Sequence, residues 1–177
     1  MATPPDFTTG QVLTAAQMNA VGLWLVKSQT IGTGVSSVTV TNAFSADYDN
    51  YKIMLSGGSL SVDQVIGLQL GSTSSNYQGS LIYLNYGGAS PAIATTTTGA
   101  NFTFAGLGYS TGLYMNVELD SPFLSANTLL RSVWSSRVEA GSYGGVLINT
   151  TSYSSFTVIP AAGTMTGGTI KIYGYRK

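Results

Sequence analysis

Short runs of alternating apolar and polar residues dominate the chain from Val35 onward. They recur at intervals of roughly 10 to 17 residues, and clusters of Gly, Ser, Asn and Pro separate them. Alternation with a period of two puts every second side chain on one face of a β-strand, and the separating clusters are typical of turns. The pattern predicts an all-β protein, an antiparallel sandwich or barrel with a buried and a wet face on each strand.

Three runs show this alternation most clearly: residues 51–55, 66–70 and 113–119. We expect the first two to be central strands. Their predicted inward residues, with those of the third run, are Tyr51, Ile53, Leu55, Ile66, Leu68, Leu70, Leu113, Met115, Val117 and Leu119. Further strands are expected over 37–41, 81–86, 101–105, 129–135, 145–148, 155–159 and 168–175. About ten strands are enough for two packed sheets, and segments 87–91 and 95–99 are expected to be surface loops because Gly and Pro surround them.

The start of the chain has a different pattern. Residues 14–17 (TAAQ) match a capping box, and an apolar stripe at helical spacing follows it as far as Leu25. We therefore predict an arm and one short α-helix over residues 1–27, followed by the β-sandwich domain over 28–177. The helix either packs on its own domain or docks into a partner. Its expected anchor contacts are Phe7, Leu13, Met18, Trp24 and Leu25.

Charge and hydropathy argue against two classes of function. Seven Lys and Arg balance seven Asp and Glu among 177 residues, and charged residues make up only 8% of the chain. Nucleic-acid binding depends largely on clustered Lys and Arg, so we expect no nucleic-acid partner. No run reaches the 18 or more apolar residues of a membrane span, and no signal peptide is recognisable, so we expect a soluble chain without membrane insertion.

The sequence contains no His and no Cys, which removes the commonest general bases, metal ligands and thiol nucleophiles. We expect a protein that is not an enzyme and that holds no cofactor or metal. The cluster Asp47–Asn50 has oxygens suited to calcium, but a turn before the next strand is the better interpretation. Glu118 and Asp120 are interpreted as solvated charges at the end of a strand.

Tyrosine is the remaining functional signal, with eleven residues in the chain. Tyrosine combines a flat apolar body with a polar tip, which suits it to interfaces. Six tyrosines are expected in or beside loops, where they contact a glycan or a neighbouring subunit: Tyr83, Tyr86, Tyr109, Tyr114, Tyr143 and Tyr153. The alternative is that they are ordinary residues of sheets, which are enriched in Tyr. Because few charges are present to protect strand edges, we also expect a homo-oligomer.

Three segments resemble one family. Residues 7–19 (FTTGQVLTAAQMN) resemble the leader F-x-x-G-x-V-L-T-A-x-x-M-N at the start of small structural proteins of tailed bacteriophages. Residues 44–53 and 167–174 look like the first core strand and the last strand of the same proteins. The segment 57–159 carries no motif that matches the family.

The resemblance implies a non-enzymatic virion component with a jelly-roll-like β-sandwich, usually a homotrimer, held to other virion proteins by its N-terminal segment. It is similar both to short tail fibres, which touch a host cell-surface glycan, and to capsid decoration proteins such as cement proteins and head fibres. Of these two we favour the tail fibre. The expected localisation is the virion, assembled in the host cytoplasm. A cell-surface lectin of non-viral origin is a further alternative, which requires a signal peptide.

Overall fold

The computed structural model describes residues 9–10, 12, 22–88 and 90–176. This part of the chain is all-β and antiparallel, as the alternation predicts. No helix within these ranges is long and apolar enough to cross a membrane. The strands are β1 (Leu23–Thr30), β2 (Val38–Val40), β3 (Tyr48–Gly57), β4 (Ser59–Leu60), β5 (Gln64–Leu70), β6 (Tyr77–Asn85), β7 (Ala92–Gly99), β8 (Phe102–Tyr109), β9 (Gly112–Asp120), β10 (Thr128–Ser135), β11 (Glu139–Leu147), β12 (Phe156–Pro160), β13 (Met165–Thr166) and β14 (Thr169–Arg176).

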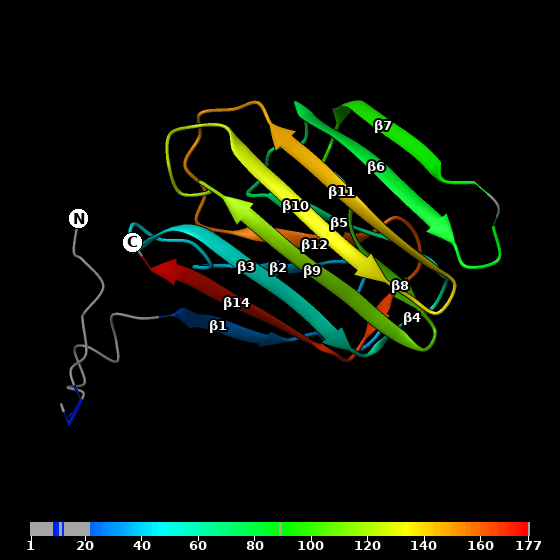
Figure 1. Cartoon of the computed structure of the whole chain (residues 1–177), viewed down its shortest axis with the longest axis horizontal. Helices are drawn as coiled ribbons and strands as arrows, with labels where there is room; N and C mark the ends of the chain where they lie inside the picture. The colour runs from blue at the N-terminus through cyan, green and yellow to red at the C-terminus, as the bar shows by residue number, and fades with distance from the viewer. Residues whose placement is uncertain (1–8, 11, 13–21, 89, 177) are drawn as a thin grey trace.

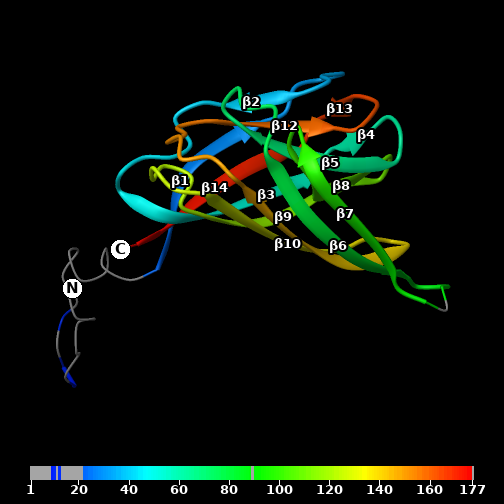
Figure 2. The same ribbon diagram turned by 90° about the horizontal axis from the view of Figure 1, so that it is seen from above.

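Twelve of these strands form one hydrogen-bonded sheet that folds over on itself into two layers. The larger layer has the order β1-β14-β3-β9-β10-β11-β6-β7, and the smaller layer has the order β2-β12-β5-β8. Figure 1 looks onto the larger layer with β5, β12 and β2 behind it, and Figure 2 shows the two layers from above. This arrangement agrees with the predicted sandwich. Strands β4 and β13 pair separately in a two-stranded sheet.

The two layers are continuous at β9. One edge of β9 pairs with β3 along nearly its whole length, from Gly57↔Leu113 to Asn50↔Asp120. The other edge is divided, because its first half pairs with β8 and its second half with β10. Beyond β9 the larger layer continues through β10, β11, β6 and β7, so it extends past the smaller layer.

The core lies between the layers and contains the residues that the alternation predicts. Ile53, Leu68 and Val117 have no exposed surface, and every inward residue predicted for the three clearest runs is buried. The strands β3 and β5 each have a neighbour on both sides, as expected. Alternation was a sufficient guide here because one face of each strand meets the other layer while the opposite face meets water.

The predicted helix is wrong at its C-terminal end. Trp24 and Leu25 lie in β1, which pairs with β14 through Trp24↔Gly174 and Leu25↔Tyr173. The sheet therefore begins at Leu23 and not at residue 28. The backbone hydrogen bonds to β14 come from the far end of the sequence, and they outweigh a local helical spacing of apolar residues. The rest of the predicted helix, and the predicted anchors Phe7, Leu13 and Met18, lie outside the described residues.

Segment 95–99 is also not a loop, because it is part of β7, which pairs with β6 through Thr95↔Ser80 and Ala94↔Leu81. As an edge strand β7 needs a partner on one side only, and its Thr residues have a high preference for extended backbone. The sequence likewise underestimates β11, which begins at Glu139 rather than at 145.

Candidate functional site

The outer face of the larger layer carries most of the exposed large apolar side chains of the described chain. Ile93 is 74% exposed, Val133 65% and Leu25 55%. Ile93 lies opposite Ile82 on the neighbouring strand, so two exposed isoleucines adjoin one another. The other exposed apolar residues on this face are Leu23, Met54, Leu84, Tyr114 and Leu129. Scattered apolar residues are normal on a surface, but a face that gathers them is typical of an interaction site.

Charges at the centre of the same face pair with each other. Arg131 Nη2 lies 3.1 Å from Asp120 Oδ2 and 3.8 Å from Glu118 Oε2, and Lys52 Nζ lies 3.7 Å from Glu118 Oε1. The Tyr175 hydroxyl donates a 2.9 Å hydrogen bond to Glu118. Glu118 and Asp120 are thus part of a network with two cations, and not only solvated strand-end charges. Two positive and two negative groups leave this cluster without net charge.

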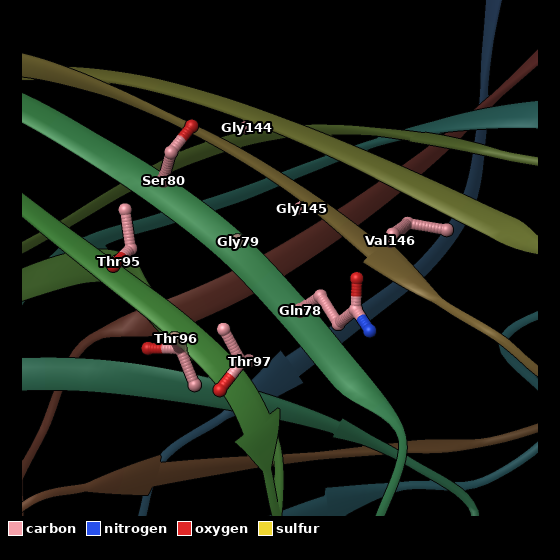
Figure 3. A pocket seen from close by; sticks show the side chains of 9 residues that line it. All are labelled: Gln78, Gly79, Ser80, Thr95, Thr96, Thr97, Gly144, Gly145 and Val146. Carbon is pink, nitrogen blue, oxygen red and sulfur yellow. The ribbon is translucent and has the colours of Figure 1, made fainter.

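A shallow groove of about 370 Å³ lies on the extension of the larger layer, over β6, β7 and β11. Figure 3 shows its side chains, and those of Gln78, Ser80, Thr95, Thr96 and Thr97 are polar. A Cβ atom added at Gly144 would meet nothing within 4 Å, so the space above this glycine is open and contributes to the groove. The lining contains no charged side chain and no aromatic ring. The groove offers hydrogen-bonding groups but little to hold a ligand in place.

Two adjoining hollows lie on the opposite, inner side of the same extension. The first, of about 200 Å³, is lined by the aromatic rings of Tyr83, Phe104 and Trp134 and by aliphatic residues. The second, of about 210 Å³, is lined by Asp63, Gln64 and Tyr109 among others. Val65, Leu107 and Glu139 border both hollows. They form where the larger layer extends past β5 and β8, so the inner faces of β6 and β7 are only partly covered.

The six tyrosines predicted as contacts lie in three different environments. Tyr83 and Tyr109 line the hollows, whereas Tyr114 is exposed on the outer face of β9 and Tyr86 is 60% exposed just after β6. Tyr143 and Tyr153 are buried in the core. Residues 109 and 114 have their ring centroids 6.3 Å apart. A contact role is therefore open to Tyr83, Tyr86 and Tyr114 in this conformation, whereas Tyr109 is a core residue that reaches the second hollow with only a small exposed area.

The buried tyrosines have structural partners. Tyr153 shares a 2.7 Å hydrogen bond with the Thr73 hydroxyl, and Tyr143 packs against Phe104 with ring centroids 5.8 Å apart. Burial raises the pKa of Tyr143 to about 12. Burial also raises the pKa of Tyr109, whose hydroxyl donates to Ser136 Oγ at 3.1 Å. These phenols stay protonated at neutral pH and act as packing groups rather than as bases.

The turn before β3, which contains Asp47, is stabilised by hydrogen bonds between its own residues. The Ser45 hydroxyl donates to Asp47 Oδ2 at 3.0 Å and accepts a bond from the Asp47 backbone N–H at 3.3 Å. This is the behaviour expected of a turn. Within the described residues, no group of three or more Asp, Glu, His or Cys is placed to hold a metal ion.

Comparison with known proteins gives no match, whether with family models, with curated proteins or with solved structures. The function is therefore argued from the residues and from the geometry above.

Proposed function

We propose that this chain is a non-enzymatic structural protein of a tailed-bacteriophage virion, a homotrimer that serves as a short tail fibre. The observation that carries the proposal is the outer face of the larger layer, which gathers exposed apolar side chains around a charge cluster without net charge. The leader at residues 7–19 supports the phage assignment. The absence of His and Cys from the sequence supports a role without catalysis.

The strand order supports the jelly-roll part of the proposal. With the hairpins β6–β7 and β10–β11 set aside, β1-β14-β3-β9 faces β2-β12-β5-β8. This is the order of an eight-stranded jelly roll. Consecutive strands alternate between the two layers, except that β5 and β8 follow one another in the smaller layer. The two hairpins are then insertions that pair with each other, through β11 and β6, to widen one layer. Jelly rolls are common in viral capsid and lectin domains.

Contact between copies would cover the apolar outer face. In a homotrimer the residues nearest the three-fold axis meet their own copies, and a net charge there would be repelled. The Lys52, Glu118, Asp120 and Arg131 cluster avoids this cost because its charges cancel within one chain. Contact would also shield the outward side chains of the β1 and β7 edge strands, which carry Leu23, Leu25 and Ile93.

Antibody labelling of intact particles tests the virion assignment. Particles of the phage that encodes the chain are labelled with an antibody raised against residues 22–176 and imaged by electron microscopy. Label at the tail tip supports the tail fibre. Label over the head replaces it with the second candidate, a capsid decoration protein, which the small mass of 18.4 kDa favours. Particles that carry no label contradict both.

A further inference from the structure

The two hollows between β5, β8 and the inner side of the extension have features that packing alone does not require. Glu139 is a half-buried acidic residue that lines the same hollow as the rings of Tyr83 and Trp134. Charged groups are expensive to bury in apolar surroundings, so an acidic residue in such a wall needs a reason. Asp63 and Gln64 are exposed and line the second hollow, which gives it a polar opening to solvent.

We propose that the two hollows form one binding groove for an uncharged sugar residue of a glycan. This deepens the tail-fibre proposal by naming its ligand class, and it rests on that proposal only for its biological setting. A sugar ring has faces made of C–H groups, which pack on aromatic rings, and hydroxyl groups around its rim. Tyr83 and Phe104 supply aromatic surface in the first hollow, and Tyr109, which is only 8% exposed, supplies a smaller area in the second.

The polar groups of the groove match sugar hydroxyls. A carboxylate accepts hydrogen bonds from hydroxyl donors, and such charge-assisted bonds are shorter and stronger than neutral ones. Glu139 borders both hollows and is therefore placed to accept from a ring in either one. The Gln64 amide both donates and accepts, and so suits a hydroxyl group. A few polar groups in an otherwise apolar pocket are the usual way to fix a small ligand.

The same lining selects against acidic sugars. Glu139 and Asp63 are both carboxylates, and no Lys or Arg lines either of the two hollows. The exposed Arg137 is close enough to act on the Tyr109 hydroxyl, but it offsets only one of the two carboxylates, so a sialic or uronic acid would add to a net negative charge at this site. Like charges at close range in a partly buried site are costly, so the groove favours neutral sugars.

Trp134 provides a reporter for the test. The sequence contains only Trp24 and Trp134, and Trp24 lies on β1, away from the residues that line the groove. In a Trp24→Phe background, the emission of Trp134 is measured while glucose, galactose, mannose and N-acetylglucosamine are added separately. We expect a saturable change with at least one of them. Glu139→Gln keeps the shape and removes the charge, and we expect it to weaken binding by about ten-fold, as for the loss of one charge-assisted hydrogen bond.

Two further variants separate binding from folding. Gln64→Ala changes an exposed side chain at the opening and should also weaken binding, so it replaces Glu139→Gln if that variant does not fold. Gln78→Ala is the matched control, because Gln78 is an exposed glutamine on β6 that lines neither hollow, and the affinity of this variant should not change. The proposal is overturned if no neutral sugar gives a saturable change, or if Glu139→Gln and Gln64→Ala bind as the parent does. It is also overturned if choline chloride, a small organic cation, saturates the signal and the sugars do not. This test uses no virions, so it fails independently of the virion assignment.

Discussion

Gln29 Nε2 donates a 3.1 Å hydrogen bond to the carbonyl oxygen of Thr39. The two residues lie on β1 and β2, the edge strands of opposite layers. Lys27 Nζ donates to the carbonyl oxygen of Thr41 in the same way. Because an edge strand has backbone groups without a strand partner, these side chains occupy carbonyls that another chain could otherwise pair with. On the side of the sandwich where β1 and β2 are the edge strands, side-chain hydrogen bonds therefore connect the two layers, and no backbone pairing between described strands does so.

Removal of this link should loosen the edge. Gln29→Ala deletes the hydrogen bond to Thr39, and we expect the free energy of unfolding to fall by about 1 kcal/mol, the usual net value of one such bond. Urea denaturation followed by circular dichroism measures it. Ser28→Ala is the control, since Ser28 is exposed on the same strand and lies opposite Lys171. Equal stability of Gln29→Ala and Ser28→Ala would show that the link contributes nothing.

Two glycines in the extension of the larger layer differ in whether the structure has room for a Cβ atom. A Cβ atom at Gly79 would overlap the Tyr143 ring and hydroxyl, whereas one at Gly144 on the neighbouring strand meets nothing within 4 Å. We expect Gly79→Ala to lower the free energy of unfolding by about 1–3 kcal/mol through overpacking. Gly144→Ala should change it by no more than about 0.5 kcal/mol. Thermal and urea denaturation of the pair measure this difference, and a similar loss in both would contradict the close contact.

High pH should destabilise the fold through two buried phenols. Burial raises the pKa of Tyr77 and of Tyr143 to about 12. In the unfolded chain a tyrosine titrates near pH 10, at about its ordinary value. The folded state therefore binds these protons more tightly, so their contribution to stability is complete below about pH 10 and is lost as the pH rises through about 12.

Urea denaturation at a series of alkaline pH values measures this loss. The free energy of unfolding should decline across the window from about pH 10 to about pH 12, and Tyr143→Phe should show a smaller decline. The ultraviolet absorbance of tyrosinate in the folded protein provides an independent check. If all the tyrosines ionise together near pH 10 while the protein stays folded, the two phenols are not shielded as described.

The outer face should carry the contact between copies. Val133→Glu and Ile93→Glu each place a charge on this face, where it would be buried in an oligomer without a partner. We expect both variants to fold and to sediment as smaller species than the parent chain. Val62→Glu is the matched control, because Val62 is 50% exposed in the turn between β4 and β5 and should leave the assembly unchanged. A parent-like mass for Val133→Glu and Ile93→Glu would exclude this face.

Alternation predicted the strands that have water on one side and the other layer on the opposite side. The run 113–119 is the clearest example, and all four of its inward residues are buried. The strand at the start of the chain was missed because its partner is distant. Trp24 pairs with Gly174, and no local window of sequence contains both residues. The spacing of Trp24 and Leu25 from Met18 and Val21 fits a helix equally well, and only the long-range pairing decides between them.

Only some residues of the proposed sugar-binding groove, which the two hollows form, could be predicted from the sequence. Tyr83 and Tyr109 were identified as contacts from their residue type, but Phe104, Trp134 and Glu139 were not identified. Phe104 and Trp134 belong to strand runs in which an inward aromatic residue indicates core, and Glu139 follows a turn in which an acidic residue is ordinary. Their convergence depends on the pairing of β10 with β11 and of β11 with β6, which places Trp134, Glu139 and Tyr83 on one inner face. Conversely, Tyr143 lies in the run Gly-Ser-Tyr-Gly-Gly (141–145) and resembles a loop residue, yet it lies opposite the buried Ser132 and is itself buried in the core.

The central claim is that copies of this chain associate through the outer face of the larger layer. The most direct test is the mass of the unmodified full chain in solution, measured by light scattering coupled to size-exclusion chromatography. The proposal predicts a single species of three times 18.4 kDa over a range of concentrations. A species of 18.4 kDa at every concentration would contradict it, and the exposed apolar residues of the outer face would then need another partner.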